Sequence, residues 1–475
     1  MNIKLERSLS LSQYVLSLKV FASTNGKNPE LIPPAKPTPH ELKPLSDIDD
    51  QEGLRCHVAG IQFYRKNPVM DGKDPVMIIR DAVARALVFY YPLGGRLREA
   101  ASRKLVVECT GEGVLFIEAD ADVTLQQFGD SLLPPFPCLE ELLYDVPGSG
   151  GMVNCPLMLI QVTRLKCGGF ILAFRHNHTI GDAAGFFQFM SAVGELARGA
   201  KVPSIPPVWQ RDLLSARDPP HISCTHHEYD DVLDTKGTLI PPDDMVYHSF
   251  FFGASEISAL RQRLLSSLRG CSSFELLTAC LWRCRTIAIS PDPNEEVRVL
   301  FLVNSRKRFN PPLPVGYYGN TFALPVAIAI AENLSKNPLS YALELVRKAK
   351  ADVTEEYMKS VADLMVIRGR PQFTMVQTYL VVDVTHVRFE DVDFGWGKAA
   401  YGGPAKGAGE TPGAVSVCIP FKNNKGENGI VVPICLAANA MEVFVKELEM
   451  MLKMDDDDDD LRAVRKDSVF IASAL

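Results

Sequence analysis

The apolar positions of residues 1–200 recur with two periods, one typical of strands and the other of amphipathic helices. Val76, Ile79 and Val83 fall on one face of a helix, whereas Arg80 and Arg85 fall outside that face. A Cys-Gly-Gly turn interrupts a long alternating stretch and so predicts a hairpin. Helices and strands therefore share this part of the chain. We expect strands at residues 58–64 and 97–108, a hairpin at 158–174, and helices at 75–88 and 183–197.

Prolines and charges break the periodicity between residues 201 and 247, where seven prolines are crowded together. We interpret this stretch as a long crossover between two lobes, so the predicted units are 1–200, 201–247 and 248–475. Strands and helices alternate in both lobes, which places the fold in the α/β class. In the second lobe we expect strands at residues 250–252, 297–304, 373–384 and 429–437, and helices at 255–268, 272–285, 338–360 and 442–453.

Length and composition agree with two domains, because 475 residues at 47% hydrophobic content exceed one ordinary core. Six of the negative charges lie in the run 455–460, interpreted as a solvated hinge rather than a cation site, and the rest is near neutral. The chain has no stripe of basic residues, so we do not expect nucleic acid as a partner. No apolar stretch reaches the length of a membrane span, and residues 9–22 lack the clean apolar core of a signal peptide.

The cysteines bear on the compartment and on metal binding. Their number is eleven and they are scattered, which favours free thiols in a reducing environment. Cys280 and Cys284 lie one helical turn apart and could hold a metal, but no second ligand pair follows, so buried packing is preferred. The chain ends in Ser-Ala-Leu at residues 473–475, a loose form of a peroxisomal address. A peroxisomal and a cytoplasmic location both stay open.

The most informative pattern is His178, four residues before Asp182, where an apolar run stops and a Gly/Ala turn begins. A histidine near neutrality can take the proton of a hydroxyl whose oxygen attacks a carbonyl. Asp182 could fix the turn that aims the ring, by accepting backbone N–H groups or by pairing with an arginine. The alternative is that His178 is a hydrogen-bonded core histidine. His176 shares its face on a strand, and we interpret it as structural.

Two other chemistries receive less support. A metal site at the two histidines is not expected, because no carboxylate or thiolate stands at ligand spacing. No Gly-x-Ser-x-Gly elbow supports a serine nucleophile, and none of the cysteines lies in a recognisable motif. Direct transfer without a covalent enzyme intermediate is therefore favoured.

A second unusual cluster, Asp-Phe-Gly-Trp-Gly, contains Asp393, Gly395 and Trp396 and leads into a loop rich in glycine and proline. We expect Asp393 to pair with an arginine, with Arg306 or Arg308 as the candidates, and so to join two distant segments. An ordinary surface turn is the alternative.

A third dense turn precedes Asn320 and Thr321, whose side chains could supply hydrogen-bond donors or simply complete the turn.

Five motifs in order together resemble the BAHD family of plant acyl-CoA-dependent acyltransferases, and the likeness covers almost the whole chain. Two positions depart from the family pattern, with Tyr318 in place of Phe and Gly94 in place of Ala. The motifs are Leu-Ser-Asp-Ile-Asp (45–49), Tyr-Pro-Leu-Gly-Gly-Arg-Leu (91–97), His-Thr-Ile-Gly-Asp (178–182), Tyr-Tyr-Gly-Asn (317–320) and Asp-Phe-Gly-Trp-Gly (393–397).

The resemblance implies a monomer with a two-lobed chloramphenicol-acetyltransferase-like fold and a central solvent channel. His178 would be the general base, and Asp182 and Asp393 would be structural. Acyl-CoA would be a cosubstrate and a small alcohol the acceptor, with no cofactor and no metal. The phosphates of CoA call for cations or helix N-termini. The candidates for these contacts are Ser272, Ser273, Arg306 and Arg308.

The amino-acid sequences of several further segments most resemble those of alcohol acyltransferases that join benzoyl-CoA to benzyl alcohol. Two alternatives stay open. One keeps the fold but uses acetyl-CoA or another donor with a different alcohol or an amine, because channel side chains decide acceptor choice. The other is a non-catalytic acyl-CoA-binding protein.

Overall fold

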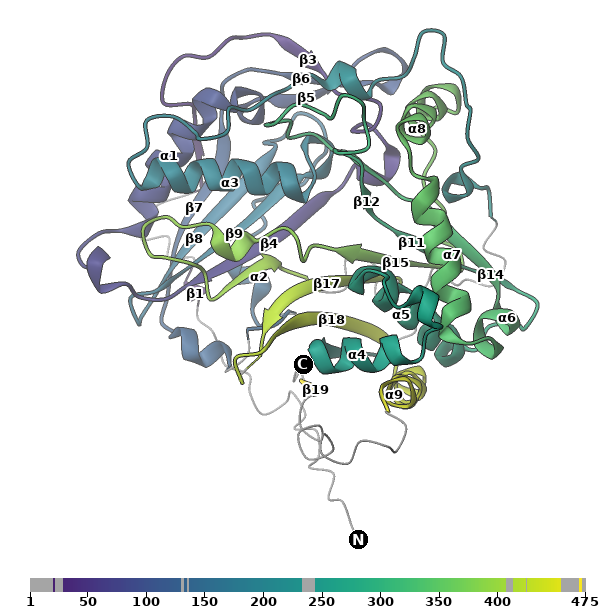
Figure 1. Ribbon diagram of the computed structural model, residues 1–475. Coiled ribbons are helices and arrows are strands. Elements are labelled where there is room, and N and C mark those ends of the chain that lie inside the picture. Colours follow the sequence, from purple (N-terminus) through teal and green to yellow (C-terminus); the bar gives the residue numbers. More distant parts are fainter. Residues whose placement is uncertain are drawn as a thin grey trace.

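The computed structural model describes residues 20–21, 29–129, 132–134, 136–232, 244–406, 413–423, 425–453 and 470–471. The molecule has two lobes, each built on a mixed sheet of seven strands among these residues (Figure 1). This arrangement confirms the predicted two-lobed α/β class. The acidic run 455–460 and the Ser-Ala-Leu ending lie outside the described residues.

The first lobe packs two helices against one sheet, and both helices share a core with it. The predicted hairpin is present, with Met158 paired to His176 across its strands. The predicted strand 97–108 is instead a tight hairpin in a separate three-stranded sheet. The elements are α1 (Pro75–Phe89) and α3 (Ala183–Ala197), β4 (His57–Tyr64), β7 (Val114–Ala121), β8 (Met158–Leu165) and β9 (Phe170–Asn177) in the large sheet, with β1 (Val20–Phe21) and β2 (Glu30–Ile32) against β7, and β3 (Leu42–Pro44), β5 (Arg96–Glu99) and β6 (Leu105–Glu108) in the small one.

In the second lobe the helices share one core with the sheet, and α5 lies at the centre, where it packs against α7 and α9. Its sheet runs in the order β14, β11, β15, β17, β18, β10, β19. The helices are α4 (Ala254–Gln262), α5 (Ser273–Ile289), α6 (Ala331–Lys336), α7 (Leu339–Asp352), α8 (Glu355–Ile367) and α9 (Ala438–Leu452), and the strands are β10 (Met245–Phe252), β11 (Glu296–Phe301), β14 (Val326–Ile330), β15 (Thr378–Asp383), β17 (Val415–Lys422), β18 (Asn428–Ala437) and β19 (Phe470–Ile471).

One strand of the second half crosses to the first lobe. β16 (Tyr401–Pro404) pairs antiparallel with β4, with Tyr401 opposite Phe63, and so forms the edge of the first sheet. Phe394 and other apolar side chains just before β16 belong to the first core. The predicted unit 248–475 therefore does not hold together as one lobe, because residues 387–405 pack with the first.

The predicted single helix at 338–360 is wrong. α7 ends at Asp352, and α8 begins anew at Glu355 after an extended Val353 and Thr354. The hydroxyl oxygen of Thr354 accepts the backbone N–H of Tyr357 at 3.1 Å, which is the contact of an N-cap. Threonine at this position therefore starts a second helix instead of continuing the first.

The predicted crossover 201–247 is irregular over its described part, with short 3₁₀ turns at Arg211–Leu214 and His227–Tyr229, and β10 already begins at Met245. Residues 233–243 lie outside the described part. No helix within the described ranges is long and apolar enough to cross a membrane.

Candidate active site

His178 follows the last residue of β9 and opens a 3₁₀ turn that leads to α3. Its backbone N–H donates to the carbonyl oxygen of Cys56 at 2.9 Å, and the side chain of Asn177 caps the turn by accepting the N–H of Thr179. The strand end is therefore fixed on both sides, and the half-buried imidazole is held in place by the sheet rather than by a loose loop.

Burial lowers the pKa of His178 below its ordinary value, while its own carbonyl, Asp182 and Asn320 act in the opposite direction. The ring is consequently neutral near pH 7, which is the protonation state that a general base needs. Its Nδ1 atom is buried and has no hydrogen-bond partner among the described residues.

His176 is buried two residues earlier, and its ring stacks on that of Phe186 with the centroids 4.2 Å apart and the planes within 3°. Burial, reinforced by the neighbouring His178, lowers its pKa to about 3. A ring that stays neutral over the physiological range exchanges no proton there. This geometry agrees with the packing role interpreted for His176.

Asp182 is the N-cap of α3 and makes both kinds of contact expected for it. Its Oδ1 accepts the N–H of Gly185 at 2.9 Å. The guanidinium of Arg306 donates to both carboxylate oxygens at 2.8 Å, and the N–H of Thr321 adds a longer bond of 3.2 Å. Burial raises the pKa of Asp182, but Arg306 and these N–H donors outweigh it and lower the pKa below its ordinary value. The aspartate is therefore ionised and tied to the second lobe.

The predicted ion pair of Asp393 is wrong. Its carboxylate accepts the backbone N–H groups of Gly395 at 2.7 Å and Gly397 at 2.8 Å, and no arginine side chain in the described ranges pairs with it. Arg198 does contact this residue, but through the backbone carbonyl. Of the two arginines considered, Arg306 binds Asp182. The other, Arg308, donates to the carbonyl of Val353 at 2.9 Å.

The Asp-Phe-Gly-Trp-Gly segment lies at the far end of α3 from the histidine. Phe394 packs against Tyr64 and Trp396 meets Phe170 edge to face, with centroids 5.5 and 5.2 Å apart. Arg198, which donates to Asp393, is the C-cap of the 15-residue α3, whereas Asp182 is its N-cap. At about 1.5 Å per residue the two ends are roughly 22 Å apart. The segment therefore contacts the C-terminal end of α3, remote from the turn of His178.

A buried cluster that the sequence did not predict lies beneath His178. Asp49, the last residue of the early Leu-Ser-x-x-Asp motif, accepts two bonds of 3.0 Å from Arg211 and two of 2.9 Å from Asn320. Arg211 also donates to the carbonyl of Ile180 at 2.8 Å. The motif gave a signal for Asp49, but neither partner could be assigned, because they are 162 and 271 residues away along the chain.

Aromatic rings surround the guanidinium of Arg211, which is an environment suited to a buried arginine. Trp209 lies 4.4 Å from it and Tyr318 lies 5.1 Å away, measured from the guanidinium carbon to the ring centroids. The side chains of Arg211 and Asp49 are only 1% and 0% exposed. The crossover is thus locked to both lobes next to the histidine turn.

Comparison with known proteins places this geometry in a family. The model of the Transferase family matches residues 23–451. The chain belongs to that family. The BAHD resemblance stated from the motifs is therefore confirmed, as is the prediction that the chain is an acyltransferase.

Similar proteins include two called benzyl alcohol O-benzoyltransferase. The protein from Nicotiana tabacum is 70% identical and that from Petunia hybrida 68%, each over 440 residues, 92% of this chain and 96% of the relative. Alcohol acyl transferase 1 allele GSa of Malus domestica is 55% identical over 446 residues, with 92% and 96% covered.

The solved structures share the fold. Vinorine synthase matches with a TM-score of 0.68 at 23% identity, over 90% of this chain and 98% of that one. TRI101 of F. sporotrichioides, complexed with coenzyme A and T-2, matches at 0.63 and 16% identity, over 86% and 98%.

The predicted CoA contacts at Ser272 and Ser273 lie at the start of α5. The Oγ of Ser272 accepts the N–H of Glu275 at 3.2 Å, and Glu275 accepts the N–H of Ser272 at 2.8 Å, which is the predicted capping box. Ser273 lies 3.5 Å from a guanidinium nitrogen of Arg261. Arg306, another candidate, donates to Asp182 and to the carbonyl oxygen of Gly319, and its contact with CoA stays a prediction.

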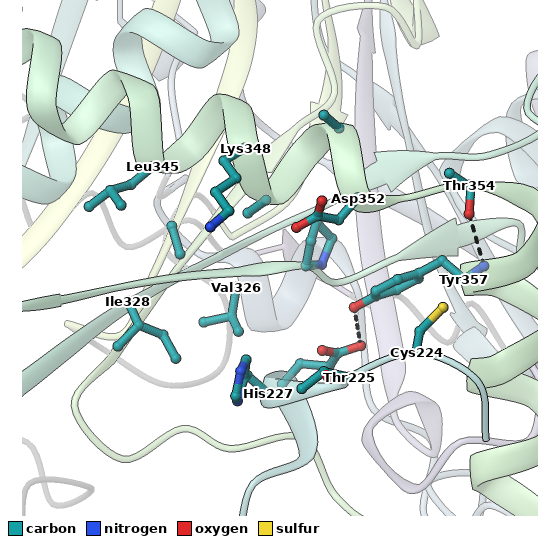
Figure 2. A pocket seen from close by; sticks show the side chains of 15 residues that line it. Cys224, Thr225, His227, Val326, Ile328, Leu345, Lys348, Asp352, Thr354 and Tyr357 are labelled. Atoms are coloured by element: carbon teal, nitrogen blue, oxygen red, sulfur yellow. Dashed lines mark hydrogen bonds between the residues drawn. The ribbon is translucent and has the colours of Figure 1, made fainter.

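A groove of about 650 Å³ lies away from His178. It opens between the crossover, the edge strand β14 and α7, with Lys348 and Asp352 projecting from α7 and with Val326 and Ile328 on the strand (Figure 2). A small void of about 20 Å³ adjoins His176 and Gly181. The predicted channel between the lobes stays a prediction.

Beside this groove, Ser360, His226 and Glu228 are arranged like a nucleophile, a base and an orienting acid. The imidazole lies 2.8 Å from the hydroxyl of Ser360 and 3.1 Å from the carboxylate. Ser360 is fully buried, however, and its oxygen already accepts two backbone N–H groups at 3.0 Å. The trio therefore fastens the crossover to α8 and offers no accessible nucleophile. Within the described residues no group of three or more His, Cys, Asp or Glu could hold a metal.

Proposed function

We propose that the chain transfers a benzoyl group from benzoyl-CoA to the hydroxyl of benzyl alcohol. The observation that carries the chemistry is the neutral, half-buried imidazole of His178 at the end of β9, on a turn held by the ion pair of Asp182 and Arg306. The names of the relatives from Nicotiana tabacum and Petunia hybrida, at 70% and 68% identity, support the choice of donor and acceptor.

In the proposed reaction, His178 takes the proton of the alcohol as its oxygen attacks the thioester carbonyl. The tetrahedral intermediate then collapses, the C–S bond breaks, and the imidazolium returns the proton to the CoA thiolate. The enzyme ends in its starting state and needs no cofactor, because acyl-CoA is a cosubstrate. Asp182 does not touch the substrate in this scheme but holds the turn on which the base stands.

For the CoA phosphates we propose the N-terminus of α5, with the exposed Ser272, with Ser273 and with Arg261 beside it. Backbone N–H groups and the helix dipole favour an anion there, and a nearby guanidinium adds a bidentate donor. Arg308 is exposed and stays a candidate contact. We further propose that the enzyme is a monomer. A peroxisomal or cytoplasmic location stays a prediction, to be tested by fusing residues 473–475 to a fluorescent reporter.

The test is to incubate the purified protein with benzoyl-CoA and a panel of alcohols, and to detect free CoA and esters. Benzyl benzoate as the main product supports the proposal. Release of CoA with another donor or acceptor retains the acyltransferase but refutes the substrates. No turnover with any pair of donor and alcohol would instead favour a non-catalytic acyl-CoA-binding protein.

A matched pair of variants tests the base. His178→Ala should lower kcat by at least about 10²-fold, which is the usual contribution of general base catalysis. His227→Ala makes the same change at an exposed histidine of the crossover and should leave kcat unaltered. Equal activity of both variants would refute the assignment of His178.

A further inference from the structure

The ring of Phe322 lies beside the imidazole of His178. The two ring centroids are 5.9 Å apart, and the ring planes are inclined by 55°. Phe322 begins the short strand β13 (Phe322–Ala323) of the second lobe. The preceding residue, Thr321, donates its backbone N–H to Asp182 at 3.2 Å, so the backbone that carries the phenylalanine is tied to the histidine turn. The position of this ring relative to the base is therefore set by hydrogen-bonded backbone.

The other aromatic neighbour of the base is already occupied. The ring centroid of His176 is 6.3 Å from that of His178, but His176 is buried and stacks on Phe186 of α3. The Nδ1 atom of the half-buried His178 is buried as well, which leaves Nε2 as the nitrogen for an acceptor hydroxyl. Within the described residues, the ring of Phe322 contacts no ring besides this imidazole.

Phe322 belongs to an apolar cluster that joins the two lobes next to the base. The buried members are Leu54 of the first lobe and Leu300, Phe322 and Leu324 of the second. Leu302 and Leu380 pack on this cluster and are only half-buried, so part of their apolar surface is uncovered. Val326, which also packs on it, lines the groove of about 650 Å³. The apolar surface beside the base is therefore not sealed from solvent.

The chemistry of the proposed acceptor brings its ring to the same place. An alcohol that gives its proton to His178 must hold its hydroxyl within about 3 Å of the imidazole nitrogen. In benzyl alcohol one methylene group separates this hydroxyl from the ring, so the ring must lie among the side chains that adjoin the imidazole. Two aromatic rings pack favourably with their centroids about 4.5–7 Å apart. An aromatic side chain next to the base is therefore within reach of the acceptor.

We propose that Phe322 is a specificity-determining residue whose ring packs against the aromatic ring of the acceptor alcohol, with Leu302 and Leu380 completing an apolar subsite. An alcohol with an aromatic group next to its carbinol carbon covers this surface, whereas a short aliphatic alcohol leaves much of it in contact with water. The enzyme consequently prefers benzyl-type acceptors to short aliphatic ones. The inference rests on the proposed function, in which His178 is the base and an alcohol is the acceptor.

The alternative is that Phe322 only joins the lobes as part of their shared core. In that case its replacement lowers the amount of folded enzyme and affects the conversion of every alcohol alike. A contact with the acceptor instead changes the conversion of one alcohol relative to another. A competition between two alcohols separates these roles, because both react on the same enzyme molecules and the ratio of products does not depend on the folded fraction.

The test supplies the full-length enzyme with benzoyl-CoA, benzyl alcohol and an excess of 1-butanol together, and measures the ratio of benzyl benzoate to butyl benzoate. Phe322→Leu and Phe322→Met both remove the ring but keep an apolar side chain, and each should lower this ratio about three- to tenfold, the usual effect of losing an aromatic pair. The KM for benzyl alcohol should rise with kcat little changed, as expected when a binding contact is lost. An unchanged product ratio in both variants would overturn the proposal.

Phe444→Leu is the matched control. It removes a fully buried ring from α9, in the core that this helix shares with the second sheet, and should leave the ratio of the two esters at the wild-type value. A competition between benzoyl-CoA and acetyl-CoA for benzyl alcohol should likewise be unaffected by Phe322→Leu. If the ratio of donors shifted instead of the ratio of alcohols, the ring would contact the acyl group and the proposal would be wrong.

Failure of the inference and failure of the proposed function give different results. Wild-type enzyme that forms no benzyl benzoate refutes the proposed function, and the inference with it, before any variant is made. Wild-type enzyme that forms benzyl benzoate, with both variants at the wild-type product ratio, refutes only the role of Phe322.

Discussion

Arg306 and Asp182 form a two-bond ion pair between the lobes, with both nitrogen–oxygen distances at 2.8 Å. The aspartate simultaneously caps α3, so one carboxylate couples a helix start in the first lobe to a loop of the second. Removal of either partner should therefore disturb the histidine turn even though neither residue is assigned contact with the substrate.

Arg306→Ala leaves the largely buried carboxylate of Asp182 without its charge partner. We expect a loss of unfolding free energy of about 3–5 kcal/mol and a fall in kcat. Asp182→Asn in the same chain removes the stranded charge, so the double variant should be more stable than Arg306→Ala alone. Urea unfolding of the single and double variants measures this coupling, and strictly additive losses would contradict it. Arg306→Lys retains the charge but not the two parallel bonds, so its free energy of unfolding should lie between those of the wild type and Arg306→Ala.

The pH–rate profile should place the acid limb of kcat/KM below pH 6.5, the ordinary pKa of histidine. Burial lowers the pKa of His178, and a general base works in its neutral form, so activity should persist as the pH falls through 6.5 and be lost only at the lower pKa. Rates of CoA release in buffers of constant ionic strength measure the limb. A midpoint above 6.5 would argue that another group is the base or that the ring is not desolvated.

Gly185→Ala should be strongly destabilising. A Cβ at Gly185 would lie 2.1 Å from the backbone carbonyl oxygen of Tyr318, which is rigid backbone of the other lobe. We expect a loss of about 1–3 kcal/mol, the usual cost of overpacking, together with reduced activity from the displaced turn. Gly150→Ala is the control, because no atom lies within 4 Å of the added carbon. Thermal melting compares the two, and equal melting temperatures would contradict the predicted clash.

Asp393→Ala should reduce stability much more than it reduces kcat. The substitution leaves the N–H groups of Gly395 and Gly397 without their acceptor, at about 1–3 kcal/mol if water does not replace it. The site at the other end of α3 should retain its geometry in the folded fraction. Asp393→Asn keeps an acceptor oxygen of the same reach and should be close to wild type. A large loss of kcat at unchanged melting temperature would instead place Asp393 in the reaction.

Short sequence patterns correctly predicted the turn of His178 and the helix starts, because neighbouring residues determine these features. The alternation of 158–174, the Gly/Ala turn and the capping aspartate together gave the hairpin, the turn of His178 and the start of α3 at Ala183. The capping box at Ser272 likewise gave the start of α5. Each depends on residues within a few positions of one another, so a single sequence contains the information.

The sequence does not show in the same way which residues that are far apart along the chain contact each other. Arg306 was considered for Asp393, whereas it binds Asp182, because two carboxylates competed for it and the sequence does not say which one folding brings near. Arg211 went unassigned because a buried arginine cannot be told from an exposed one until the rings around it are placed. The break before Thr354 was missed because the apolar periodicity continues from α7 into α8 and concealed the cap.

The pairing of β16 with β4 constrains the order of events during synthesis. The edge of the first sheet gains its neighbour only after Pro404 has left the ribosome, so for most of translation β4 exposes unpaired backbone groups. Such an edge is a template for association with other chains. A nascent or truncated first half should therefore depend on chaperones, and a fragment ending at residue 200 should aggregate unless residues 387–405 are supplied with it.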